Sequence, residues 1–254
     1  MSPSKDPLVR SGHKIPPGIR PTARDAGVLA WLGEVKIAGT DSMQAAYNHF
    51  GGTVLAQQSL SKRLAQLSAA GYLGSAILHR GRNRRVYWPG NDPYRVTRRT
   101  MEHDLIAAHL SVQLLQAGGS RRFHHNRAVP AELAKDPRRW TQDLRVDRRS
   151  HHADGLLWQP NNTAVIVEVE LASKGPARLA TILNSHAKRL ADPSDAATHL
   201  LYLTTRPVGQ MVAAAWRKNG HASDHPEAMQ VIHALDDLTH ATLGQIHTID
   251  IPAA

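Results

Sequence analysis

Cysteine is absent from the 254-residue chain, and aromatic residues make up only 5% of it. The lack of cysteine excludes disulfides, thiolate zinc sites and thiol nucleophiles. The scarcity of aromatic side chains disfavours a base-stacking platform for single strands and leaves duplex binding as the better expectation. No apolar run approaches the length of a bilayer span, and the opening segment MSPSKDPLVR has no apolar core like that of a signal peptide. We therefore expect a cytoplasmic protein without a membrane partner.

Positive charge is in excess. The chain has 31 Lys and Arg residues against 21 Asp and Glu residues, a formal net charge of +10 at pH 7. Such an excess favours a polyanionic partner, of which nucleic acid is the commonest, with an anionic membrane surface as the alternative. We expect double-stranded DNA as the partner and leave a homodimer open. The length of the chain allows one large domain or two small ones.

The N-terminal third has the pattern of a DNA-binding domain. Residues 1–22 mix Pro, Ser, Gly and basic residues, which predicts a flexible basic tail. Residues 23–93 then show helical patterns at 26–35, 41–50 and 55–73 and strand patterns at 75–80 and 84–90, with Asp41 as the expected N-cap of the second helix. This order predicts a winged helix-turn-helix domain, in which the third helix enters the major groove and the hairpin contacts the DNA backbone.

Two groups of side chains in this domain are candidates for DNA contact. The third helix alternates leucines with polar residues, as a helix with one buried face does. The hairpin tip concentrates arginines, which repel one another unless phosphate neutralises them. A solvated surface is the alternative for both groups. Together with Arg178, the predicted DNA-binding residues are Gln57, Gln58, Ser61, Lys62, Arg63, Arg80, Arg82, Arg84 and Arg85.

The segment at 91–93 marks a domain boundary, and residues 94–254 are expected to form the second domain. Its first helix carries Glu102 and His103, either of which could reach a site on the sheet that follows. The expected elements are helices at 95–119, 176–192 and 208–218, strands at 121–129, 198–205 and 228–235, and a basic loop over 134–150. Strands that alternate with helices predict an α/β core with a mixed sheet, and an α+β protein overall.

An acidic hairpin at 151–174 carries the main chemical signal. Asp154 precedes an apolar run, a turn-forming PNNT follows, and the strand AVIVEVE places Glu168 and Glu170 on one face. Carboxylates grouped on a buried sheet are costly unless a positive group lies between them. A divalent metal is the simplest such group, and Mg²⁺ or Mn²⁺ suits the cleavage of phosphodiesters. Surface acids at a strand edge are the alternative.

The order ADG at 153–155, a hairpin, EVE at 168–170 and then Lys174 resembles the core of the PD-(D/E)XK nuclease superfamily. With a winged helix ahead of it, the chain over residues 24–206 is also similar to the plasmid replication-relaxation family of mobile elements. Ala153 stands where the pattern has proline, and Glu170 stands where it has lysine. Lys174 is the nearest replacement, because the turn-favouring ASKGP segment could fold it back toward the strand.

This resemblance implies a metal-dependent DNA endonuclease or nickase. Asp154 and Glu168, with the carbonyl of Val169, would hold the metal, which activates a water and polarises the phosphoryl oxygen. Glu170 would take a proton or bind a second metal, and Lys174 would stabilise the charge that develops on the phosphate. The alternative is a non-catalytic, sequence-specific regulator of replication or transcription that keeps a decayed nuclease fold.

Histidines give a weaker signal. The pairs at 124–125 and 151–152 and the cluster at 221–225 suggest zinc, but adjacent residues on a strand point to opposite faces and none of these has HExxH spacing. His186 lies on the apolar stripe of its helix, and we expect it to be buried and hydrogen-bonded rather than a ligand. The acidic hairpin is therefore the predicted site.

Overall fold

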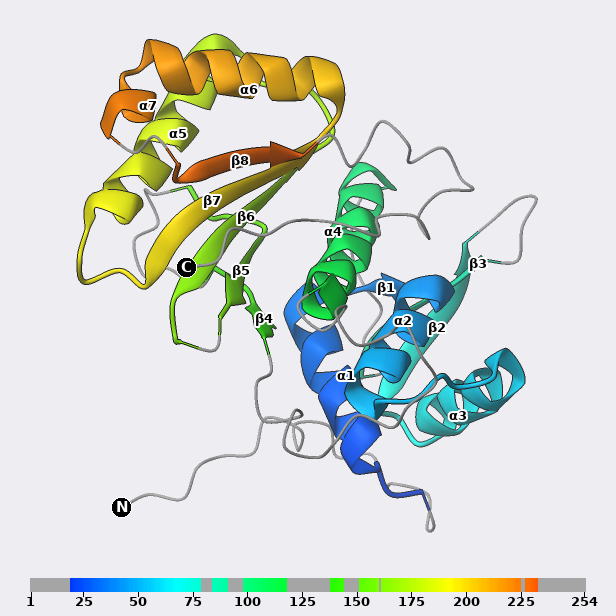
Figure 1. Ribbon diagram of the computed structural model, residues 1–254. Helices are drawn as coiled ribbons and strands as arrows, with labels where there is room; N and C mark the ends of the chain where they lie inside the picture. The colour runs from blue at the N-terminus through cyan, green and yellow to red at the C-terminus, as the bar shows by residue number, and fades with distance from the viewer. Residues whose placement is uncertain are drawn as a thin grey trace, which may run out of the picture.

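The computed structural model describes residues 19–78, 84–90, 98–117, 138–143, 151–159, 161–224 and 227–232. Over these residues the chain is a mixed α/β protein with two separate sheets (Figure 1). A three-stranded sheet belongs to the N-terminal half and a five-stranded sheet to the C-terminal half, with helix α4 between them. Among the described helices, none has the length and apolar character needed to cross a membrane.

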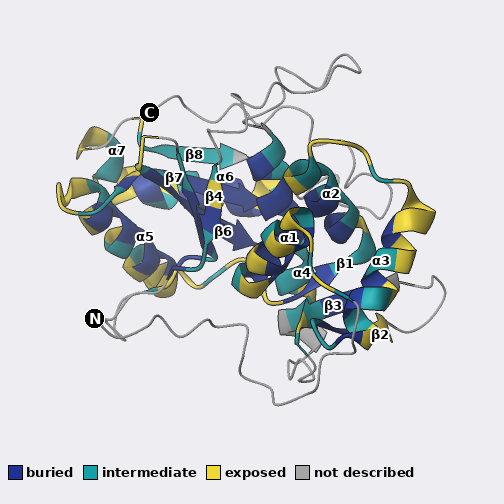
Figure 2. Cartoon of the chain, turned by 90° about the horizontal axis from the view of Figure 1, so that it is seen from below, coloured by how far each residue is buried: buried dark blue, intermediate teal, exposed yellow. Residues whose placement is uncertain are grey.

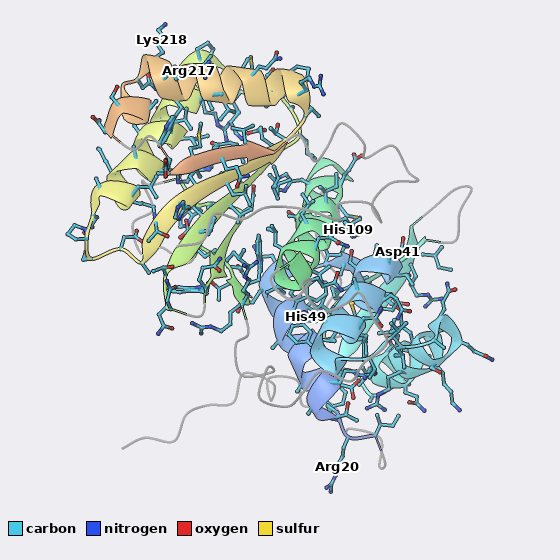
Figure 3. The ribbon with its side chains drawn as sticks, in the orientation of Figure 1. Arg20, Asp41, His49, His109, Arg217 and Lys218 are labelled. Carbon is cyan, nitrogen blue, oxygen red and sulfur yellow. The ribbon has the colours of Figure 1, made fainter. Side chains whose placement is uncertain are left out.

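The N-terminal half contains three helices in the predicted order, α1 (Ala23–Val35), α2 (Thr40–Gly51) and α3 (Gln57–Ala69). Helix α1 begins with a capping box, in which the side chains of Thr22 and Asp25 each accept a hydrogen bond from the other's backbone amide. The prediction of Asp41 as an N-cap is wrong, because Gly39 is the capping residue of α2. Asp41 lies in the first turn instead, near the positive end of the helix dipole (Figure 3).

The smaller sheet has the strand order β1-β3-β2, and its neighbours are antiparallel. Its strands are β1 (Ala38–Gly39), β2 (Leu73–Leu78) and β3 (Arg84–Pro89). Helix α3 buries its three leucines at positions 60, 64 and 67 against this half, and its polar residues remain on the outside (Figure 2). Three helices and an antiparallel strand pair are therefore present in the predicted order.

Helix α4 (Arg98–Ala117) joins the two halves and covers most of the predicted helix at 95–119. Its buried side chains belong to one apolar core that runs from α1 and α2 to the strands of the larger sheet. A polar contact reinforces this packing, since Trp31 Nε1 donates to Ser111 Oγ at 2.9 Å. The predicted boundary at 91–93 lies outside the described residues, but the core is continuous on either side of it.

The larger sheet has the strand order β4-β5-β6-β7-β8. Its strands are β4 (Arg139–Thr141), β5 (Gly155–Trp158), β6 (Ala164–Glu170), β7 (Ala197–Thr204) and β8 (Met229–Ile232). The first three are antiparallel neighbours, whereas β6, β7 and β8 run parallel. Helices α5 (Pro176–Ala191) and α6 (Arg206–Lys218) cover one face, α4 lies on the other, and the short α7 (His221–Asp224) follows α6 (Figure 1).

Strand β4 corrects the prediction of a loop over 134–150. Three residues are too few to give a periodic signal, but Trp140 is buried and its ring covers Gly155 of β5, where an added Cβ would lie 2.0 Å from the ring. The guanidinium of Arg139 lies over the ring of Trp158, 5.4 Å from its centroid. The predicted strand at 121–129 and most of the predicted tail lie outside the described residues.

Candidate functional site

Strand β6 presents its two acids to the α5 side of the sheet. Every residue of the strand is buried, and its valines pack on the α4 side. Glu168 and Glu170 therefore share the opposite face, as the alternation predicts. Gly155 pairs with Val167 in the antiparallel hairpin, and this register puts Asp154 next to Glu168. The hairpin thus brings the predicted acids of both strands to one end of the sheet.

Glu168 is the most buried acid of the hairpin, with only 3% of its surface exposed. Its Oε1 accepts hydrogen bonds from Nε2 of His151 and from Nε2 of His186, each at 2.8 Å. Burial alone would raise the pKa of Glu168, but the bonds from the two imidazoles outweigh burial and lower that pKa to about 2. Glu168 is therefore an anion held between two histidines.

Asp154 is fixed at the start of β5 by the backbone of β6 and by His103 of α4. Its Oδ2 accepts the amide proton of Val169 at 2.7 Å, and its Oδ1 lies 3.4 Å from His103 Nε2. The same Nε2 lies 3.0 Å from the carbonyl oxygen of Val169. Hydrogen bonds to Asp104 and Asp154 raise the pKa of His103 to about 10. The positively charged imidazole of His103 therefore lies between Asp154 and the Val169 carbonyl, the two groups that were predicted from the sequence to bind a metal.

Lys174 returns to the site, as the turn-favouring segment after β6 predicts. Its ammonium group contacts the carboxylate of Glu170. Burial lowers the pKa of Lys174, and the positive charge of Arg178 adds to this effect, while the charges of Glu168 and Asp154 oppose it. These charges all act on Lys174, which places the lysine among the acids of the hairpin. Burial also raises the pKa of Asp154, and the charge of Glu168 raises it further against the opposing bond from His103.

Two histidines that the sequence did not assign to the site complete it. His151, Glu168 and His186 offer ligand atoms that all lie within 4.8 Å of one another. The prediction that His186 is buried and hydrogen-bonded is confirmed, and its partner is Glu168. His151 and His152 point to different groups, as expected for neighbours, since His152 Nδ1 lies 2.8 Å from the backbone oxygen of Asp143. The available signal was the position of His151 three residues before Asp154.

The predicted DNA-binding residues of α3 fall into two classes. Four of them are exposed, namely Gln57, Gln58, Ser61 and Lys62. Arg63 is different, because its Nη2 donates to Asp25 Oδ2 at 2.6 Å and its Nε bonds the same carboxylate. Asp25 is only 1% exposed. Arg63 is therefore held by an interaction inside the domain, and the other four predicted side chains of α3 remain on its exposed face.

Of the four predicted wing arginines, Arg80 and Arg82 lie outside the described residues, and Arg84 begins β3. Arg85 is exposed, and its Nη1 donates to Ser75 Oγ at 3.2 Å. Arg178 is exposed in the first turn of α5, close to the acidic hairpin. Predicted DNA contacts are therefore available both on the strand pair and beside the acids.

The site thus combines ionised carboxylate, imidazole and ammonium groups at the end of β6. Carboxylate and imidazole atoms can bind a divalent cation, and an ammonium group can bind a phosphate oxygen. Asp154 and Lys174 retain 22% and 21% of their side-chain surface, so this end of the hairpin is open to solvent. Comparisons with protein-family models, with curated proteins and with solved structures found no match to the chain.

Proposed function

We propose that this chain is a DNA-binding protein with a metal-dependent phosphodiesterase site, which acts as an endonuclease or nickase on plasmid or other mobile-element DNA. One observation carries the proposal: Asp154 lies beside Glu168 across the hairpin, and Lys174, which contacts Glu170, is close enough for the charges of both acids to act on it. Two carboxylates can hold a metal ion that assists hydrolysis of a phosphodiester, and a lysine can stabilise the charge that develops on the phosphate.

The order of elements supports the same proposal. An antiparallel hairpin is followed by a helical crossover, α5, into the parallel strand β7, and α4 precedes the whole unit. This is the arrangement expected of a PD-(D/E)XK-like core, and the three helices and strand pair ahead of it are those expected of a winged helix. The fold class alone does not give an activity, so the activity is inferred from the residues at the site.

Each residue of the site has a role in this proposal. Asp154 and Glu168 would hold a divalent ion, with the Val169 carbonyl as a further oxygen ligand. A bound ion supplies an activated water and neutralises charge on the phosphate. Lys174 stabilises the negative charge of the transition state, and Glu170 orients that lysine through their direct contact. His103 must give up its contacts with Asp154 and the Val169 carbonyl when an ion takes its place.

The distribution of charge supports DNA as the substrate. The net charge of +10 suits a polyanion, and the exposed face of α3 offers amide, hydroxyl and ammonium groups to bases and phosphates. In Figure 1 the end of β2, the start of β3 and the N-terminal end of α4 lie toward the upper side of the N-terminal half. His103, near that end of α4, contacts the acidic hairpin. One duplex could therefore meet both the strand pair and the site.

A nicking assay on supercoiled plasmid tests the activity. The purified chain should convert supercoiled DNA to open-circular or linear DNA with Mg²⁺ or Mn²⁺ and fail to do so with a chelator. Asp154→Asn should lower the rate by about 100-fold or more, in line with the loss of a group that stabilises transition-state charge. Glu227→Gln, which removes an exposed carboxylate elsewhere in the same half, is the matched control and should cut like the wild type. Equal rates for both variants would contradict the assignment of Asp154.

A salt titration tests the DNA-binding surface. Replacing Arg80, Arg82, Arg84 and Arg85 by alanine should weaken binding to all sequences. The slope of log affinity against log salt concentration should flatten by about one unit for each phosphate that the variant no longer neutralises. An unchanged slope would remove the strand pair from the interface.

A second function has its own supporting observation. His103 already lies against Asp154, and His151 and His186 already satisfy Glu168, so the acids are compensated without a metal. This favours a sequence-specific regulator that keeps the nuclease fold as a scaffold. In that case the wild-type chain cuts no DNA topology with any ion, and Asp154→Asn leaves DNA affinity unchanged.

A further inference from the structure

We propose that His151, Glu168 and His186 form a site for a first-row transition-metal ion, such as Zn²⁺, rather than for Mg²⁺. The role of this ion in catalysis rests on the proposed function, because Glu168 is also a ligand of the metal proposed there. Binding of the ion does not itself require that DNA be cut. The two proposals can therefore fail separately.

The spacing of the three ligand atoms fits a single ion. Nε2 of each histidine lies 2.8 Å from Glu168 Oε1, and all three atoms lie within 4.8 Å of one another. Bonds of about 2.0–2.2 Å from zinc to nitrogen and oxygen give ligand-to-ligand distances of about 2.8–3.6 Å over octahedral and tetrahedral angles. The two 2.8 Å contacts therefore need to lengthen by at most about 0.8 Å to admit an ion. The separation of the two nitrogens, which is no more than 4.8 Å, must come into the same range.

The chemistry of the donors selects the class of ion. Imidazole nitrogen suits zinc, iron, copper and nickel, whereas Mg²⁺ takes oxygen ligands and keeps several waters. Two neutral imidazoles and one carboxylate leave a net positive charge on the bound ion, which favours a further anionic ligand such as a phosphate oxygen.

The burial of the three residues leaves the site open on one side. The side chain of His186 is fully buried and that of Glu168 is 4% exposed, but that of His151 is 24% exposed. Three protein ligands with an accessible side are the arrangement of catalytic metal sites, in which water or substrate takes a remaining position. The partly exposed side chains of Asp154 and Lys174 belong to the same end of the hairpin.

A simple hydrogen-bonded cluster is the competing explanation for the three residues. In the metal-free state each imidazole donates from Nε2 to Glu168, and the proton moves to Nδ1 when Nε2 binds an ion. Nδ1 of His186 is buried and has no hydrogen-bond partner among the described residues in the present geometry. When Nε2 of His186 binds an ion, Nδ1 would again have no hydrogen-bond partner unless a water enters the site. The lack of a partner at Nδ1 is therefore expected in both explanations, and a binding measurement is needed to distinguish them.

Direct titration with metal alone provides that measurement. The full chain, without a polyhistidine tag and after treatment with a chelator, is titrated with Mn²⁺, Zn²⁺ and Mg²⁺ while heat of binding and melting temperature are recorded. We expect saturable binding of one Zn²⁺ ion with a rise in melting temperature, since the ion binds the native state. Mg²⁺ at the same concentration should give neither. Mn²⁺, which stands lowest in the affinity order of these divalent metals, should bind more weakly than Zn²⁺.

Variants assign the ion to its ligands, which matters in a chain with 16 histidines. His151→Asn, at the partly exposed ligand, should weaken binding at least tenfold, because loss even of an outer partner of a metal ligand costs about 10- to 100-fold. His152→Asn, at the exposed neighbour that bonds Asp143, is the matched control and should bind like the wild type. His186→Gln repeats the test at the buried ligand, with circular dichroism to verify folding.

Absence of Zn²⁺ binding to the folded wild type would overturn the proposal, as would equal binding by the wild type and His151→Asn. Cobalt substitution gives a further readout, because the visible absorption of bound Co²⁺ depends on its nitrogen ligands and should change in His151→Asn. Transition-metal binding without nicking would leave this site standing and remove the phosphodiesterase. Nicking with Mg²⁺ and no transition-metal binding would support the phosphodiesterase and remove the site formed by the two histidines and Glu168.

Discussion

Arg63 lies on α3 beside the exposed candidates for DNA contact, but its guanidinium bonds Asp25 inside the domain. Replacing it by methionine keeps the length of the apolar stem and removes the charge. Asp25, 1% exposed, then keeps its bonds from Thr22 and from Tyr47 Oη at 2.7 Å but loses its cation. A structural role for Arg63 predicts a loss of folding stability, and a DNA-binding role predicts a loss of affinity.

The expected magnitude follows from the burial of the pair. Removing one partner of a buried ion pair costs about 3–5 kcal/mol. Because the side chain of Arg63 is 23% exposed and Asp25 retains three other donors, from Thr22 and Tyr47, we place Arg63→Met near the lower end, at about 3 kcal/mol in unfolding free energy. Adding Asp25→Asn to Arg63→Met should recover part of this loss, since it removes the unpaired charge.

The same pair predicts a dependence on acid. Burial would raise the pKa of Asp25, but hydrogen bonds from Arg63, Thr22 and Tyr47 outweigh burial and hold the pKa well below its usual range. A lowered folded pKa means that the stabilisation is complete above the unfolded value of about 3.9 and is lost as the pH falls below it. Arg63→Met should therefore lose less stability than the wild type between pH 4 and pH 2, measured by urea denaturation.

Lys62→Met is the matched control, because Lys62 is the adjacent exposed cation. It should leave stability within about 0.5 kcal/mol of the wild type, as surface changes do. It should also flatten the salt dependence of DNA binding by about one unit if Lys62 contacts a phosphate. Arg63→Met should do the opposite, lowering stability and leaving the slope unchanged. If Arg63→Met keeps full stability and flattens the slope, the reasoning from burial is refuted.

Three further changes test other parts of the structure. Gly155→Ala puts a Cβ against the buried Trp140 ring and should lower stability by about 1–3 kcal/mol in a denaturant titration, whereas Gly175→Ala, with open space around it, should be nearly neutral. The pKa of His103 is raised to about 10, so the stabilisation of the fold by His103 is complete below about pH 6.5 and is lost as the pH rises through 10. His103→Gln should therefore flatten the fall in melting temperature between these pH values. An unchanged profile would contradict the pairing of His103 with Asp154. Gln57→Ala should change the preference among DNA sequences by about 1–3 kcal/mol, and equal loss on all sequences would argue against base contact.

Local rules were enough for the parts of the site that lie close together in the chain. Alternation along a strand puts Glu168 and Glu170 on one face whatever the rest of the fold does. A short hairpin then fixes the register, which brings Asp154 to Glu168. The turn-forming residues after β6 account for the return of Lys174. Each of these steps depends on a short stretch of neighbouring residues, so each could be predicted from the sequence.

Tertiary packing decided the rest. His186 meets Glu168 because α5 docks on β6 with its buried stripe inward, and His103 meets Asp154 because α4 crosses the far face of the sheet. Neither docking angle is encoded in a local pattern. Arg63 has the pattern of an exposed polar face, and only the fold puts its partner Asp25, 38 positions away, beside it. Strand β4 was missed because pairing with β5, and not its own three residues, creates it.

The shared helix α4 has a mechanical consequence. It is a rod of 20 residues, about 30 Å long at 1.5 Å per residue. One end carries His103 at the acidic hairpin, and farther along His109 Nδ1 lies 3.4 Å from Ser42 Oγ of α2. A duplex that tilts the N-terminal helices would therefore move an imidazole at the acids. If the imidazole moves in this way, binding of the duplex changes the affinity of the acids for an ion by some factor. Thermodynamic reciprocity then requires that binding of the ion change the affinity for the duplex by the same factor.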